Sequence, residues 1–178
     1  MIKSFLKFTI FIGISYGLYY WYSSPLVYVD PENGCNIVIE QSFTYKQREV
    51  KKAIEFIKSN SPEYYKKMCD YVKVVDNGAL CPNSPIGRVF ACVHSGWSVG
   101  FKPLADSSNE ELASYLVHET CHYQEGRNRR DNPDPTYYLT ENYENNSAKE
   151  QQRCFDEQNK FLEKVGSPLR YPYAKRNK

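Results

Sequence analysis

Two histidines and a glutamate form the most chemically informative pattern in the chain, His118-Glu119-Thr120-Cys121-His122. On a helix, residues four positions apart lie on the same face, so both imidazoles can bind one metal ion. Glu119 then lies beside the first ligand, where it can take a proton from a metal-bound water without binding the metal itself. The chain has three histidines, and two of them belong to this pattern. The spacing therefore predicts a Zn²⁺ site with His118 and His122 as ligands and Glu119 as the catalytic general base.

A catalytic zinc site needs a third protein ligand and keeps one position open. No histidine follows His122, so we expect the third ligand to be a carboxylate from the next predicted helix. The candidates on that helix are Glu141, Glu144 and Glu150. Glu150 lies one helical turn before Cys154, and a bond between Cys121 and Cys154 would draw this carboxylate toward the metal.

The two predicted helices resemble the gluzincin clan of zinc metallopeptidases, the thermolysin-like and minigluzincin-like group, over residues 88–166. In that clan the second helix carries a glutamate followed three residues later by a small residue, and Glu144 with Ser147 fits this pattern. The resemblance implies Glu144 as the third ligand, with Glu150 as the alternative. Ala148 departs from the pattern, because many members have an aspartate there that orients a histidine.

The same resemblance implies a peptide or protein substrate that pairs with an edge strand just before the first helix. The segments 89–94 and 97–101 are the candidates for this strand. His94 could contact the substrate, although a lone histidine on a strand is more often structural. Tyr137, Tyr138 and Tyr143 are candidates for the donor that stabilises the oxyanion.

Zinc-dependent peptide-bond hydrolysis is the function predicted by these features. The alternative is a non-enzymatic extracytoplasmic binding module with a vestigial or structural metal site. Hydrolysis of a non-peptide amide by the same zinc chemistry is a third interpretation, which the sequence does not separate from peptidase activity.

Two helices must hold the site. Serines and glutamates at 107–111 predict a helix start, and this helix continues to about residue 126 with both histidines on its apolar side. A second long helix is predicted from residue 141 to about residue 165, capped by Thr140.

The upstream chain predicts a small sheet. Apolar residues at helical spacing predict a helix capped by Thr44, followed by a short helix over 62–69. Strands are predicted at 36–40 and 71–75, with one or two more over 88–101, whereas residues 23–34 are expected to be a lead-in. The expected fold is therefore α+β. It has a small mixed or antiparallel sheet packed on an active-site helix and a ligand-bearing helix, in a zincin-like domain held by disulfides.

Six cysteines in a small exported domain predict disulfides, although the sequence alone does not choose among the pairings. Cys81 and Cys92 flank a short segment that could be a loop or hairpin. Cys121 and Cys154 lie on the two helices that a metal site would bring together, which leaves Cys35 with Cys69. A cysteine zinc site is disfavoured because the chain has no C-x-x-C spacing.

The N-terminal residues differ in character from the rest of the chain. Residues 5–22 are almost entirely apolar or aromatic, with Lys3 and Lys7 on their N-terminal side. Positive charge before such a stretch favours a cytoplasmic N-terminus and an exported remainder. We therefore expect residues 1–24 to be a membrane anchor or a signal peptide, and residues 25–178 to be a zincin-like peptidase domain outside the cytoplasm. An uncleaved anchor is favoured over a cleaved signal because no small-x-small cleavage site is clear.

The net charge is +2 with both signs interspersed, so no basic stripe predicts nucleic acid as a partner.

Overall fold

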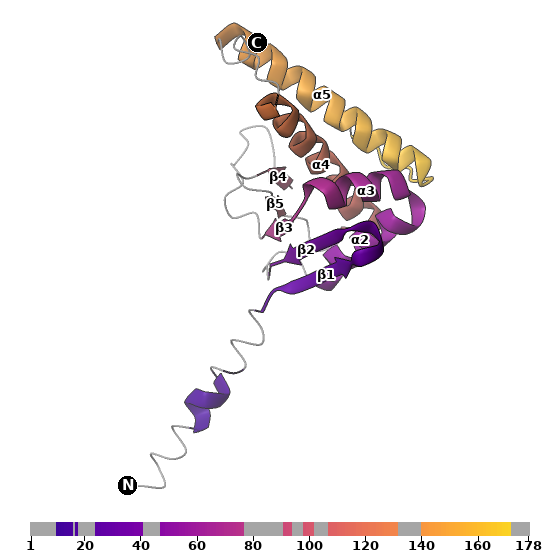
Figure 1. Ribbon diagram of the computed structural model, residues 1–178. Coiled ribbons are helices and arrows are strands. Elements are labelled where there is room, and N and C mark those ends of the chain that lie inside the picture. The colour runs from indigo at the N-terminus through magenta and orange to yellow at the C-terminus, as the bar shows by residue number, and fades with distance from the viewer. Residues whose placement is uncertain are drawn as a thin grey trace.

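The computed structural model describes residues 10–15, 17, 24–40, 47–76, 91–93, 98–101, 107–131 and 140–171. Side-chain environments are described for these residues except 91–93, 98, 101, 127–131 and 140–146. Within this part of the chain the fold is α+β, as predicted, with a mixed sheet and four principal helices (Figure 1).

The described strands form a five-stranded sheet in the order β1-β2-β3-β5-β4. Its strands are β1 (Leu26–Asp30), β2 (Cys35–Ile39), β3 (Val74–Asp76), β4 (Ala91–Val93) and β5 (Ser98–Phe101). The β1–β2 and β4–β5 pairs are antiparallel, and the central pairs β2–β3 and β3–β5 are parallel. Strand β4 therefore forms one edge of the sheet, whereas β5 is paired on both sides.

Two helices, α2 (Gln47–Asn60) and α3 (Pro62–Tyr71), connect the parallel strands β2 and β3. The apolar stripe of α2 is completely buried, namely Val50, Ala53, Ile54 and Ile57. Pro62 begins α3 at the position where a missing backbone N–H costs least. Both helices thus supply the core that supports the helix carrying the histidines.

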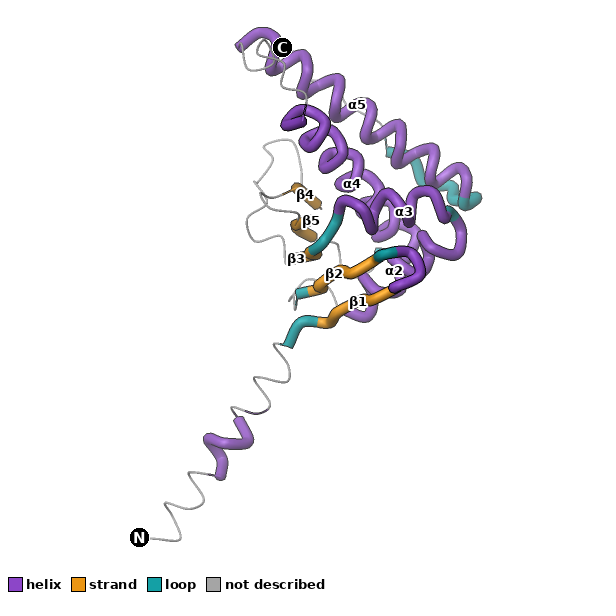
Figure 2. Tube along the Cα trace, in the orientation of Figure 1, coloured by secondary structure: helices purple, strands orange, loops and turns teal. Residues whose placement is uncertain are grey.

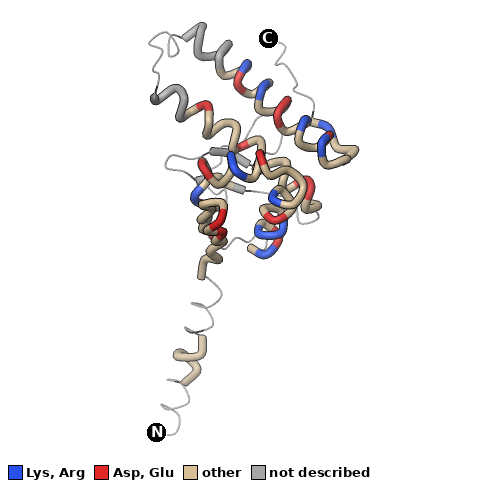
Figure 3. Tube along the Cα trace, turned by 45° about the vertical axis from the view of Figure 1, so that its right-hand side comes forward, with Lys and Arg blue, Asp and Glu red and all other residues tan. Residues whose placement is uncertain are grey.

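The two longest helices, α4 (Asn109–Asp131) and α5 (Thr140–Lys164), lie side by side in Figure 2 and pack against each other. Basic and acidic residues alternate along α5 in Figure 3, with no long run of one sign. Helix α4 also packs on α2, α3 and β4, which makes it the central element of the domain.

The lead-in predicted at residues 23–34 is wrong in part, because Leu26–Asp30 forms strand β1. Tyr28 and Asp30 face the core, whereas Val27 and Val29 are more than half exposed. Since the exposed positions are valines, the strand shows no alternation of polar and apolar residues in the sequence. The turn to β2 ends at Gly34, whose φ of 65° is left-handed and favours glycine.

The predicted end of the first long helix near residue 126 is also early. Helix α4 continues through Gly126 to Asp131. A glycine inside a helix costs only about 1 kcal/mol relative to alanine, so it does not by itself end one.

Two disulfides are present among the described side chains, and both are pairs expected from the sequence. Cys35 of β2 is bonded to Cys69 of α3 with a Cα–Cα distance of 4.7 Å. Cys121 of α4 is bonded to Cys154 of α5 with a Cα–Cα distance of 5.5 Å. The expected Cys81–Cys92 pair lies outside the described side chains.

Residues 10–15 are helical and lie away from the sheet (Figure 1). Their large apolar side chains are more than half exposed, namely Ile10, Phe11, Ile12 and Ile14. No helix within the described ranges has the length and apolar character needed to cross a membrane. Most of the predicted anchor, residues 1–24, lies outside those ranges.

Candidate functional site

Helix α4 places the histidine motif inside the domain. Ser108 caps the helix, with its Oγ accepting a hydrogen bond from the Glu111 backbone N–H at 3.1 Å. Every residue from Leu112 to Cys121 is buried, which means that this stretch is covered on all sides. A helix enclosed in this way holds its side chains in fixed positions, as a metal or catalytic site requires.

The two imidazoles of the motif converge on each other. Nε2 of His118 lies 3.2 Å from Nε2 of His122, and the ring centroids are 4.9 Å apart. His118 is 8% exposed and also packs on Phe155 of α5, with ring centroids 4.6 Å apart. The helical spacing predicted from the sequence thus brings two imidazole nitrogens, the type of atom that binds zinc, close enough to face one ion.

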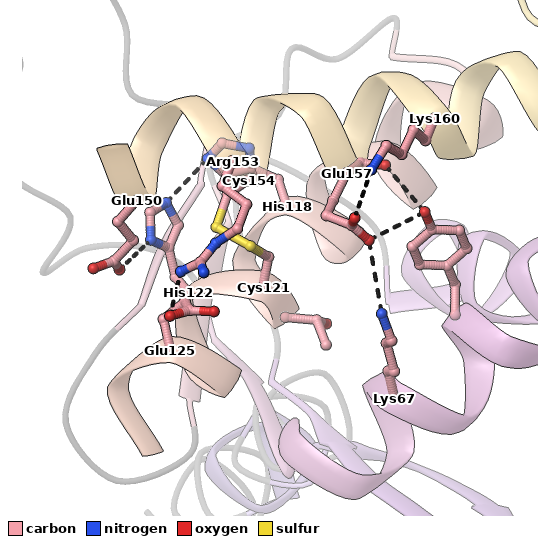
Figure 4. The surroundings of a disulfide bond; sticks show 12 residues. Lys67, His118, Cys121, His122, Glu125, Glu150, Arg153, Cys154, Glu157 and Lys160 are labelled. Atoms are coloured by element: carbon pink, nitrogen blue, oxygen red, sulfur yellow. Dashed lines mark hydrogen bonds and ion pairs between the residues drawn. A yellow bond between two sulfur atoms is a disulfide. The ribbon is translucent and has the colours of Figure 1, made fainter. Parts of the chain in front are cut away.

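Glu150 of α5 contacts the opposite side of the second ring. Nδ1 of His122 is 2.8 Å from Oε1 of Glu150, and both side chains are 12% exposed (Figure 4). Burial lowers the pKa of His122, but the hydrogen bond to Glu150 and the charges of Glu119 and Glu150 outweigh it and raise this pKa above its ordinary value. Glu150 was expected as an alternative metal ligand, and its described contact is with Nδ1 instead of the converging Nε2 atoms.

Glu119 is 5% exposed on the same helix. Burial raises the pKa of its carboxyl to about 7, and the nearby charge of His122 opposes this rise. A carboxyl group with a pKa near neutrality can both accept and release a proton at physiological pH. Glu119 therefore has the environment of a general acid–base residue.

Burial has the opposite effect on His118, whose pKa falls to about 3, with the charge of His122 adding to the decrease. Its ring is therefore neutral at physiological pH. Its Nδ1 atom is buried without a hydrogen-bond partner among the described groups. The Cys154 backbone and the side chains of Gln158 and Gln151 act in the opposite direction on this pKa, but they do not outweigh burial and the charge of His122.

Gln151 and Gln158 were not predicted as part of the site. Gln151 lies near both histidine rings, and Gln158, 1% exposed, donates a hydrogen bond to Ser114 Oγ at 3.0 Å. The sequence does carry a signal for them. Gln151, Cys154 and Gln158 follow the spacing of a buried helical stripe, where a polar side chain needs a polar partner.

A cavity lies between α3, α4 and α5, next to the Cys121–Cys154 disulfide. Thr120 and Cys121 are among the residues that line it. Its charged residues are paired with each other, Arg153 with Glu125 and Lys67 with Glu157 (Figure 4). Neither histidine of the motif lines this cavity. It is therefore separate from the candidate site.

Comparisons of the chain with models of known protein families, with curated proteins and with solved structures find no match. The chemistry of the site must be inferred from its own contacts.

The converging histidines fit two positions of a zinc centre. Zinc binds imidazole nitrogens at about 2.0–2.1 Å in tetrahedral geometry, which separates two such nitrogens by about 3.3 Å. The 3.2 Å between the two Nε2 atoms agrees with this separation. No set of three His, Cys, Asp or Glu able to hold a metal occurs among the described residues. Two histidines thus have a spacing that zinc could bridge, and no third candidate ligand is found among the described side chains.

The remaining predicted site residues lie where no side chain is described. The backbones of Glu141, Tyr143 and Glu144 belong to α5, whereas His94, Tyr137 and Tyr138 lie in segments outside the described ranges. Glu144 is seven residues before Gln151, which corresponds to two turns, or about 10 Å, along the same side of the helix. Its role as third ligand stays a prediction.

Proposed function

We propose that this chain is a zinc-dependent peptidase of the zincin type, with His118 and His122 as metal ligands and Glu119 as the general base. The observation that carries this proposal is the 3.2 Å approach of the two Nε2 atoms beside a buried glutamate. A solvated pair of histidines would not need to converge, and it would leave Glu119 with the pKa of an ordinary surface acid.

Bound zinc would supply Lewis-acid chemistry, lowering the pKa of a water and polarising the scissile carbonyl. Glu119 would take the proton of the attacking water and pass it to the leaving amine. The third ligand would come from α5, with Glu144 the carboxylate favoured by the gluzincin resemblance.

The position of β4 supports a peptide as the substrate. Strand β4 is at the edge of the sheet and packs on α4, so an extended peptide could pair with its outer side. Strand β5 is paired with β3 and β4, which leaves it no free edge. Of the two segments expected to bind substrate, the one containing Ala91–Val93 is thus favoured.

The first experiment measures zinc and hydrolysis in the full-length chain and in Glu119→Gln. We expect one zinc per chain, chelator-sensitive cleavage of a fluorogenic peptide library by the wild type, and retained zinc in Glu119→Gln. Hydrolysis by the variant should fall by about 10²-fold or more, the usual contribution of a general base. Glu110→Gln, which makes the same chemical change in the first turn of α4, should keep both properties.

Full activity in Glu119→Gln would contradict the proposed role of this residue. A wild-type chain that binds zinc in a closed four-ligand site and cleaves no peptide would instead favour the non-enzymatic binding module.

A further inference from the structure

The hydrogen bond between His122 and Glu150 restricts how the imidazole can carry its protons. An ionised carboxylate only accepts hydrogen bonds, so the 2.8 Å contact requires a proton on Nδ1 of His122. A neutral imidazole has one N–H, so Nε2 of the neutral ring is unprotonated and carries a lone pair. That lone pair faces His118, at the point where the two rings converge (Figure 4).

The same geometry separates Glu150 from the converging atoms. The two nitrogens of an imidazole lie on different sides of the ring, and in Figure 4 Glu150 and His118 flank His122 on opposite sides. A carboxylate engaged with Nδ1 cannot share a metal with Nε2 of the same ring. Glu150 therefore acts on the site through His122.

Two further links between α4 and α5 lie close to this contact in the sequence. The Cys121–Cys154 disulfide joins α4 to α5 one turn beyond Glu150, and Arg153 forms an ion pair with Glu125. The contact itself is 12% exposed on both sides, where a charged hydrogen bond is stronger than in water. The two helices thus present the carboxylate to Nδ1 in a fixed position.

We propose that Glu150 is a positioning residue that fixes the Nδ1-protonated tautomer of His122 and aims its Nε2 lone pair at a zinc ion, and that it is not a metal ligand. This inference rests on the proposed zinc site. Many gluzincins orient a histidine with an aspartate at the position of Ala148. In this chain Glu150, two residues later on the same helix, would supply the orienting carboxylate.

The test compares Glu150→Gln with Glu163→Gln, an exposed glutamate on the same helix, in the full-length chain. Metal affinity is measured by zinc competition against a chelating indicator, and the metal environment by the visible spectrum of the Co²⁺-substituted protein. We expect zinc affinity to fall about 10–100-fold in Glu150→Gln, the usual effect of removing an orienting partner. At saturating Co²⁺ the spectrum should match the wild type, and Glu163→Gln should change neither measurement.

A second measurement uses the metal-free protein. At a pH high enough to keep the ring of His122 neutral, its ¹⁵N chemical shifts should report a protonated Nδ1 and an unprotonated Nε2 in the wild type and a mixture of tautomers in Glu150→Ala. A Co²⁺ spectrum altered at saturation would identify Glu150 as a ligand and overturn the proposal, as would an unchanged affinity or tautomer. Failure of the wild type to bind zinc would remove the proposed function, whereas the tautomer result alone would still report whether Glu150 orients His122.

Discussion

Two buried carboxyl groups, Glu119 and Asp30, have pKa values shifted in opposite directions because their surroundings differ. In the candidate site burial raises the pKa of Glu119 to about 7 and lowers that of His118 to about 3, because both charged forms lose hydration. Asp30 is just as buried, at 7% exposed, yet it stays ionised. Hydrogen bonds from Lys58, Tyr65 and Asn33 hold its pKa well below the ordinary range.

The Asp30 cluster predicts an acid-sensitive contribution to stability. Lys58 Nζ and Tyr65 Oη each lie 2.7 Å from Oδ2 of Asp30, and Tyr65 also hydrogen-bonds Tyr28 Oη at 2.9 Å. Because the folded-state pKa is lowered, this contribution is fully present above the unfolded-state value of about 3.9 and declines below it. Asp30→Asn should therefore lower the urea midpoint at pH 7, and its difference from wild type should shrink between pH 5 and pH 2.

Asp70→Asn is the matched control, because Asp70 pairs with Lys66 on an exposed helix surface. This variant should change the urea midpoint very little at any pH. A difference between Asp30→Asn and wild type that stays constant from pH 5 to pH 2 would contradict the lowered pKa.

At the scale of elements, the sequence predicts the helices better than the sheet. The cap at Ser108 and the spacing of His118 and His122 are local, so α4 and its histidine pair could be predicted. Strand β1 could not, because its exposed valines hide the alternation and its pairing with β2 is a tertiary contact. The contact of Glu150 with Nδ1 of His122 depends on how α5 is rotated on α4, which spacing along one helix does not determine.

The two disulfides should contribute similarly to the stability of the domain but differently to the geometry of the candidate site. They close loops of nearly equal length, with sequence separations of 34 for Cys35–Cys69 and 33 for Cys121–Cys154. The chain-entropy model predicts that each contributes about 4 kcal/mol to the free energy of unfolding. Replacing either pair by serines should thus lower stability in urea by a similar amount.

The effects on the metal site should differ between the same two variants. Only Cys121–Cys154 joins the helices of the candidate site, so its serine variant should also weaken zinc binding, measured without urea under conditions where both variants are folded. Cys35→Ser/Cys69→Ser is the matched control and should keep the wild-type affinity. Equal zinc affinities in the two variants would show that this link does not position α5.

At the scale of the whole molecule, the disulfides and the N-terminal residues point to the same compartment. Disulfides persist in oxidising environments outside the cytoplasm. Lys3 and Lys7 lie at the start of the apolar stretch 5–22, which favours a cytoplasmic N-terminus and export of the domain on its C-terminal side. We propose that residues 1–24 anchor the domain in a membrane, with residues 25–178 on its outer side.

A C-terminal fusion to alkaline phosphatase, which is active only after export, tests this topology in a bacterial host. The full-length chain should give high phosphatase activity in the membrane fraction, because the apolar segment remains attached. Removal of residues 1–24 should reduce activity to background, and Lys3→Glu/Lys7→Glu should lower it because the charge that keeps the N-terminus inside is reversed. An inactive full-length fusion would place the domain in the cytoplasm, where the Cys35–Cys69 and Cys121–Cys154 bonds would be exposed to reduction and the link between α4 and α5 would be lost.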